Sequence, residues 1–236
     1  MIQNYIKSTF NYCIAKLPGL QTAHKAKEPY YASLALCVID SVFSIGVRYE
    51  GVKSTVNRFC QHFDLDQIGP KNGTIPKPET QTSTSEVLSL IRGKSPDYLA
   101  ERIYQNRQRT STTNGILKAE AVTLFLRILR DFGIEYFQDI PLVQNDPLFE
   151  AAIKRIPGQG SGVSLKYFFM LSGNKDLIKP DRMILRFLND ATGIKLNADQ
   201  SQLVLTAVAK LLRKEGYKIR PRMLDRLIWD YQRNLV

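Results

Sequence analysis

Apolar residues recur every three or four positions along almost the whole chain, and no long stretch alternates polar and apolar residues. This period is typical of helices with one buried face, whereas strict alternation would indicate strands. Residues 33–63 are expected to form one long helix or two adjoining ones, with a break near Gly46 or Gly51. Further helices are expected at 2–17, 85–93, 96–106, 116–132, 149–156, 162–171, 180–192, 199–215 and 221–234. The sequence therefore predicts an all-α fold.

One of these segments, 30–47, is nearly long enough and apolar enough to span a bilayer. Asp40 lies in its middle, and a charged side chain there is costly in lipid, so a buried helix of a soluble protein is the favoured interpretation. The amino terminus also lacks the apolar core of a secretory leader. We expect a cytoplasmic protein without membrane contact, associated with the nucleoid if the source is prokaryotic.

The cysteines argue against a bound metal. Cys13, Cys37 and Cys60 are far apart and form no CxxC pair, and the chain has only two histidines to supplement them. Structural zinc and iron–sulfur sites need closely spaced ligands, so neither a metal nor a cofactor is expected.

Positive charge is concentrated towards the carboxyl terminus. Residues 151–236 hold 16 Lys/Arg and 7 Asp/Glu, a balance of +9 within a chain whose net charge is +11. Residues 1–150 hold 17 and 15. Such an excess suits the phosphate backbone of nucleic acid, although a basic surface is also compatible with anionic lipid or with no ligand at all.

A glycine-rich hairpin, IPGQGSG at 156–162, separates two helical segments. Glycine permits positive φ and close backbone approach, and the helix that follows begins with unpaired N–H groups that suit a phosphate. Lys154, Arg155 and Lys166 flank the hairpin. A tight helix–helix turn is the plainer alternative, whereas a dinucleotide loop is disfavoured because no strand precedes it.

Combined with the sequence that follows it, this hairpin resembles that of the HhH-GPD (helix-hairpin-helix) superfamily of DNA glycosylases. The family pattern is an apolar residue, Pro-Gly-x-Gly, a buried helix, a short loop and Asp. Here YFFML at 167–171 supplies the buried helix, and Asp181 follows Gly162 by 19 positions. The GILKA segment at 115–119 resembles a helix start found upstream of the family's hairpin. The resemblance covers roughly 34–188 and implies that Gly158, Gly160, Gly162 and Lys166 bind a DNA phosphate.

The resemblance also implies that Asp181 is the catalytic carboxylate, which would stabilise the cationic sugar formed when a base departs. An acid in the first turn of a helix after Pro180 has a structural alternative, because it stabilises the helix dipole. Bifunctional members of the family carry a Schiff-base lysine where this chain has Gly162. The iron–sulfur loop of some members is absent as well. The resemblance thus favours a monofunctional glycosylase that uses water.

The base pocket and the DNA-penetrating wedge are less well defined by the sequence. Asp40 is an acid in an apolar helix that would border the pocket, where it could accept a hydrogen bond from a flipped base, or pair internally. Phe43 is a candidate for the wedge, or a core residue, because the family's glutamine-rich turn is missing here.

The resemblance also implies two helical lobes, one at 34–184 with six helices and the hairpin, and one formed by 1–33 with 185–236. In the second lobe, it implies that the helix at 221–234 packs with that at 2–17. The predicted function is monofunctional excision of a modified or damaged base from duplex DNA. A noncatalytic DNA-binding module of the same fold and a helical adaptor for other proteins are the alternatives.

Overall fold

The computed structural model describes residues 2–25, 29–47 and 49–235. Over these ranges the chain is mostly helical, and the only β-structure among them is a pair of isolated bridges, Tyr31 with Ile68 and Arg109 with Leu117. The prediction of an all-α fold is confirmed.

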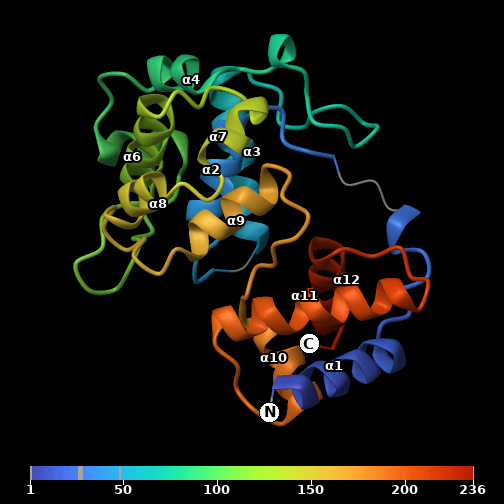
Figure 1. The fold of residues 1–236 in the computed structure, drawn as a ribbon. Coiled ribbons are helices and arrows are strands. Elements are labelled where there is room, and N and C mark those ends of the chain that lie inside the picture. Colours follow the sequence, from blue (N-terminus) through green and yellow to red (C-terminus); the bar gives the residue numbers. More distant parts are fainter. Residues whose placement is uncertain (1, 26–28, 48, 236) are drawn as a thin grey trace. The chain divides into compact units, whose positions relative to one another are not determined.

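The chain divides into two compact units (Figure 1). Residues 28–173 form one, here called the central unit, and residues 1–27 with 174–236 form the other, the terminal unit. The division at 173/174 differs from the expected lobe boundary at 184. As a result Asp181 belongs to the terminal unit, whereas the hairpin belongs to the central unit.

The central unit is built around α2 (Leu34–Phe43), every residue of which is buried. Its side chains are apolar on all faces apart from Asp40 and Ser41, which is the pattern of a helix enclosed by others. The helices α9, α6, α3 and α4 pack against it. The bounds of the remaining elements of this unit are α3 (Tyr49–Phe63), α4 (Thr84–Leu90), α5 (Pro96–Tyr98), the π-helical turn η3 (Leu99–Ile103), α6 (Lys118–Asp131), α7 (Ile140–Val143), α8 (Pro147–Lys154), α9 (Val163–Leu171) and the 3-10 turns η2 (Pro78–Thr80) and η4 (Phe137–Asp139).

The expected break within 33–63 falls near Gly46. The helix α2 ends at Phe43, and Gly46 follows with a φ of +72°, a conformation that L side chains rarely adopt. Gly51 lies inside α3. The segment 66–85, rich in Pro, Gly, Ser and Thr, is expected from the sequence to be a loop. Residues 66–83 are irregular apart from an isolated bridge and one short 3-10 turn, and α4 begins at Thr84.

The terminal unit consists of α1 (Ile2–Lys16), α10 (Arg182–Thr192), α11 (Ala198–Lys214) and α12 (Pro221–Arg233), with the 3-10 turn η1 (Ala23–Lys25). The helix α1 packs mainly on α11 and α10, and α12 packs mainly on α10 and α11. The buried ring of Phe187 on α10 lies 5.0 Å from the Tyr12 ring of α1 and 6.0 Å from the Tyr231 ring of α12. The helix at 221–234 was expected to pack with that at 2–17, and in the structure α10 and α11 both contact α1 and α12.

Among the helices that the structure describes, none combines the length and the apolar character needed to cross a membrane.

Candidate functional site

The hairpin of the central unit is closed by its own backbone. The helix α8 ends at Lys154 and α9 begins at Val163. Between them the Gln159 N–H donates to the Ile156 carbonyl and the Gly162 N–H to the Gln159 carbonyl, both at 2.9 Å. The Gln159 side chain is buried and accepts a hydrogen bond from the Ser164 hydroxyl of α9. These contacts fix the hairpin between the two helices.

The three predicted phosphate-binding glycines have different surroundings. Gly158 has a φ of +83°, and a Cβ there would lie 2.4 Å from Oγ1 of Thr110. Gly162 has a φ of +69°, and a Cβ there would lie 2.9 Å from Cε of Lys154. Gly160 needs no positive φ and is exposed, and a Cβ there would come no closer than 3.9 Å to the Lys154 carbonyl oxygen. Packing and backbone conformation thus explain why glycine is needed at 158 and 162. At Gly160 neither of them requires glycine.

The helix α9 begins without a side-chain cap. Its first residue follows Gly162 in the left-handed conformation, and the Val163 N–H is 3.5 Å from the Ser161 hydroxyl. The remaining N–H groups of the first turn and the positive end of the helix dipole favour an anion here. Lys166 is half-buried one turn into α9, and Lys154 is paired with Glu150 at the end of α8.

Asp181 is the N-cap of α10 in the terminal unit. Its Oδ1 accepts hydrogen bonds from the N–H groups of Met183 at 2.8 Å and Ile184 at 3.2 Å. Its own N–H donates to the Lys179 carbonyl at 2.7 Å. Oδ2 accepts no hydrogen bond from the described part of the chain, and the side chain is half-buried. Asp181 therefore has the capping role considered for it, and this role uses only one of its two carboxylate oxygens, Oδ1.

A second carboxyl group, which the sequence analysis missed, supports the segment before Asp181. Asp225 on α12 is buried, and its Oδ1 accepts a hydrogen bond from the Lys179 N–H at 2.9 Å. Burial raises the pKa of Asp225 to about 8, and the charge of Asp181 adds to the rise, against the opposing effect of the Lys179 N–H. The spacing in the sequence could have revealed it, because Asp225 lies three residues before the buried Ile228 and four after the buried Pro221.

The proposed pocket and wedge residues lie inside the central unit. Asp40 is fully buried and accepts hydrogen bonds from the hydroxyls of Tyr31 and Ser44, both at 2.7 Å. This is the internal pairing that the sequence left open. Phe43 is fully buried, with its ring 5.1 Å from that of Tyr104. A wedge must leave the protein to enter a base stack, so Phe43 is a core residue and we do not retain it as a wedge.

Lys118 is a buried lysine whose role the sequence did not suggest. Its Nζ donates to the carbonyls of Phe43 at 3.0 Å and Ile45 at 2.8 Å, and to Oε1 of Gln108 at 3.3 Å. It therefore joins the start of α6 to carbonyl groups left open by the end of α2. Its burial is consistent with its helical spacing to the buried residues Ala121, Val122 and Phe125.

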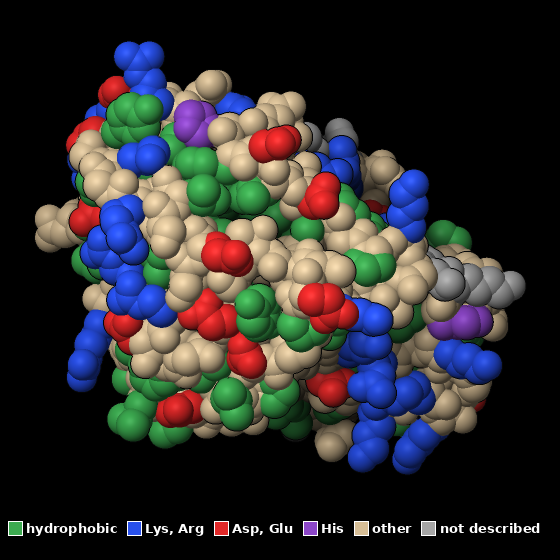
Figure 2. Space-filling model, turned by 90° about the horizontal axis from the view of Figure 1, so that it is seen from above, with side chains coloured by type: hydrophobic (Ala, Val, Ile, Leu, Met, Phe, Trp, Pro, Cys, Tyr) green, Lys and Arg blue, Asp and Glu red, His purple; other side chains and the backbone are tan. Residues whose placement is uncertain are grey.

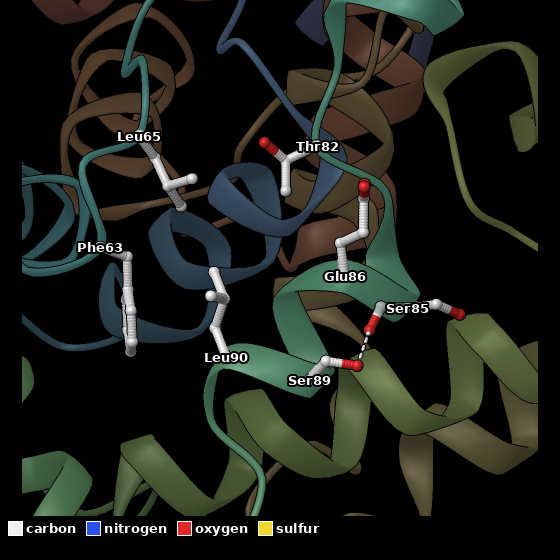
Figure 3. Close-up of a pocket in the computed structure, with 7 residues that line it drawn as sticks. All are labelled: Phe63, Leu65, Thr82, Ser85, Glu86, Ser89 and Leu90. Atoms are coloured by element: carbon white, nitrogen blue, oxygen red, sulfur yellow. Dashed lines mark hydrogen bonds between the residues drawn. The ribbon is translucent and has the colours of Figure 1, made fainter.

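A shallow pocket of about 500 Å³ lies in the central unit, between the end of α3 and α4 (Figure 3). Its lining residues are Phe63, Leu65, Thr82, Ser85, Glu86, Ser89 and Leu90. Two of its polar side chains are already used locally: the Ser89 hydroxyl donates to the Ser85 carbonyl at 3.0 Å, and Glu86 forms a capping box with Ser83. None of the predicted site residues is among the described residues that line this pocket, and none of those lining residues is basic.

The charge follows the division into units. The terminal unit holds 17 Lys/Arg and 7 Asp/Glu, a balance of +10, and its first 27 residues contain no acid. The central unit holds 16 and 15, a balance of +1. On the face drawn in Figure 2, Lys and Arg side chains gather in groups, one of them dense. The basic character of the chain is thus a property of the terminal unit.

Among the residues that the structure describes, no three His, Cys, Asp or Glu side chains gather as metal ligands. No curated protein and no solved structure matches the chain. A family described as Domain of unknown function (DUF8548) matches residues 8–233, and the chain belongs to this family.

Proposed function

We propose that the protein binds duplex DNA and is a monofunctional DNA glycosylase of the HhH-GPD superfamily. Binding is supported by the +10 balance of the terminal unit and by the uncapped start of α9 after the hairpin. The hairpin would take one phosphate through the first N–H groups of α9, with Gly160 and Lys166 beside it. These features supply affinity without sequence preference.

The observation that supports a catalytic role is the hydrogen bonding of the Asp181 carboxylate. Its Oδ1 is held by two backbone N–H groups, which fixes its orientation, and its Oδ2 accepts no hydrogen bond from the described residues. A carboxylate held in this way stabilises positive charge on the sugar as the base leaves. The bond between C1′ and the base breaks with its electron pair going to the base. Water then forms a bond to C1′ and its proton is taken up by the departed base, leaving an abasic site.

A Schiff-base route does not fit the hairpin sequence. Gly162 occupies the position that the lysine takes in bifunctional relatives. Lys166 is one helical turn further on, where phosphate contact is the simpler role. We therefore propose hydrolysis without cleavage of the strand.

A noncatalytic DNA-binding module is the second candidate, and a specific observation favours it. Asp181 already serves as the N-cap of α10, which accounts for an acid at this position without any reaction. The charge of the terminal unit would serve binding equally well in either case.

The deciding experiment is base release from duplexes that carry a panel of modified bases, read with and without alkali. Asp181→Asn is the test variant because asparagine keeps the N-cap and removes the charge. Asp230→Asn, an exposed acid on α12, is the matched control. Release by the wild type and the control, with loss in Asp181→Asn and strand breakage only after alkali, supports the proposal. Salt-sensitive DNA binding with no release from any duplex favours the noncatalytic module, and breakage without alkali contradicts the hydrolytic route.

A further inference from the structure

The turn between α11 and α12 carries the densest run of basic residues in the terminal unit. Within 210–222 there is one acid, Glu215. The basic residues of this run are Lys210, Arg213, Lys214, Lys218, Arg220 and Arg222. We call this segment the basic turn.

The backbone of the basic turn is held in place by its own contacts. The Tyr217 N–H donates to the Leu212 carbonyl at 3.0 Å, and the Arg213 guanidinium donates to the Ile219 carbonyl at 3.0 Å. Ile219 is buried in the core of the terminal unit, while Lys218 and Arg220 on either side of it are exposed. Burial of Ile219 therefore holds the segment in place while the charged groups of Lys218 and Arg220 face solvent.

A neighbouring segment adds another cation. The Arg222 N–H donates to the Lys175 carbonyl at 3.1 Å, which places the exposed Lys175 beside the start of α12. Asp176 follows it and lies 3.6 Å from the Arg220 guanidinium. The surface thus has seven basic residues for two acidic ones, Asp176 and Glu215.

Helix stabilisation explains only part of this charge. Arg213 and Lys214 lie in the last turn of α11, where cations interact favourably with the negative end of the helix dipole. Lys218 and Arg220 lie beyond the helix end, in a segment without helical structure, and the dipole effect falls off within one turn. Because Lys218 and Arg220 lie beside further cations, these positive charges repel one another. Binding of an anionic partner would offset that repulsion.

We propose that the basic turn, with Lys175, is a contact surface for the phosphate backbone of duplex DNA, separate from the hairpin. The proposal rests on the proposed function only in its DNA-binding part. A lipid surface is the less suitable partner, because membrane-surface segments add large apolar side chains to their cations. Among the residues of the terminal unit that the structure describes, the large exposed apolar ones are Ile14, Ile194, Leu203 and Leu235, and all lie outside the basic turn.

The test measures the affinity of the full chain for an unmodified duplex by fluorescence anisotropy over a range of salt concentrations. The double variant Lys214→Gln/Lys218→Gln is compared with Lys7→Gln/Lys195→Gln, which removes the same charge from the terminal unit outside the basic turn. Lys195 precedes α11 and Lys218 follows it, so about 25 Å of helix separates them. Each lost phosphate contact lowers the slope of log K against log salt by about 0.9, so a reduction of about 1.8 is expected for the first variant alone.

A fall in affinity of about tenfold or more at 0.1 M salt, restored in Lys214→Arg/Lys218→Arg, supports the proposal. Equal losses in the two glutamine variants would overturn it, because total charge would then explain binding. Unchanged DNA affinity together with lost binding to phosphatidylserine vesicles would also overturn it, in favour of a lipid surface. Thermal unfolding of each variant confirms that the fold is intact. Base release is not the readout, so failure of the catalytic proposal leaves this test unaffected.

Discussion

Gly158 and Thr110 are in such close contact that no side chain fits between them: a Cβ at Gly158 would lie 2.4 Å from Oγ1 and 2.5 Å from Cβ of Thr110. The two residues are 48 positions apart, one in the hairpin and the other in the loop before α6. That loop is tied to the chain by the hydrogen bond from the Thr110 N–H to the Ile116 carbonyl at 2.9 Å. The hairpin therefore packs against the loop that precedes α6.

Gly158→Ala is expected to destabilise the protein, because it introduces both the clash with Thr110 and a side chain at positive φ. Strain of this kind costs about 2–3 kcal/mol of unfolding free energy. Denaturant unfolding measures it. Gly160→Ala is the control in the same hairpin, since its Cβ would meet nothing closer than 3.9 Å, and it should change stability by less than about 0.5 kcal/mol. Equal effects of the two substitutions would show that packing on Thr110 is unimportant.

Lys118→Met is expected to cost about 2–4 kcal/mol of unfolding free energy, because it leaves the carbonyls of buried Phe43 and half-buried Ile45 without their donor. Methionine keeps much of the side-chain length, so the loss reports on hydrogen bonding more than on volume. Thermal and denaturant unfolding give the value. Lys154→Met, at an exposed position of α8, serves as the comparison and should stay within about 0.5 kcal/mol of the wild type. A stable Lys118→Met protein would mean that water replaces the ammonium group.

Local pattern was enough to predict most helices but not the contacts between distant residues. The apolar faces of 34–43 predicted a buried helix, and a proline followed by an acid at 180–181 predicted a helix start. Phe43 and Ile45, whose carbonyls bind Lys118, and Thr110, which contacts Gly158, lie tens of residues away from them, and no periodicity connects them. Phe43 was ambiguous for the same reason, because a core aromatic and a wedge look alike until the neighbouring Tyr104 is placed.

The cysteines are expected to be unreactive in the folded protein. All three are buried, and burial raises the pKa of Cys13 to about 12 and that of Cys60 to about 11, the latter with a contribution from Asp66. The thiolate is the reactive form, so little of it exists at pH 8. Ellman's reagent at that pH should detect no thiol in the native state and three after denaturation. Rapid labelling of any cysteine in native protein would show that its site opens.

The buried carboxyl of Asp225 predicts a pH dependence of stability. Burial raises its pKa from 3.8 when unfolded to about 8 when folded. The folded state then binds more protons than the unfolded state between these values, so this group's contribution to stability is complete below pH 3.8 and declines as pH rises towards 8. Asp225→Asn keeps an acceptor for the Lys179 N–H and removes the titration. Relative to the wild type it should gain at least ~1.4 kcal/mol between pH 5 and 8, the equivalent of one pKa unit.

Denaturant unfolding at several pH values measures this gain, and two further variants identify its origin. Asp181→Asn should reduce the pH dependence in part, because the charge of Asp181 helps to raise the pKa of Asp225. Asp230→Asn removes an exposed acid from the same helix and should leave the pH dependence as in the wild type. If Asp225→Asn and the wild type lose stability in parallel from pH 5 to 8, Asp225 is ionised in the folded state. The hydrogen bond from the Lys179 N–H and the charge of Arg222 would then lower the pKa of Asp225 by more than burial raises it. Asp225 would in that case hold the segment before Asp181 as a carboxylate.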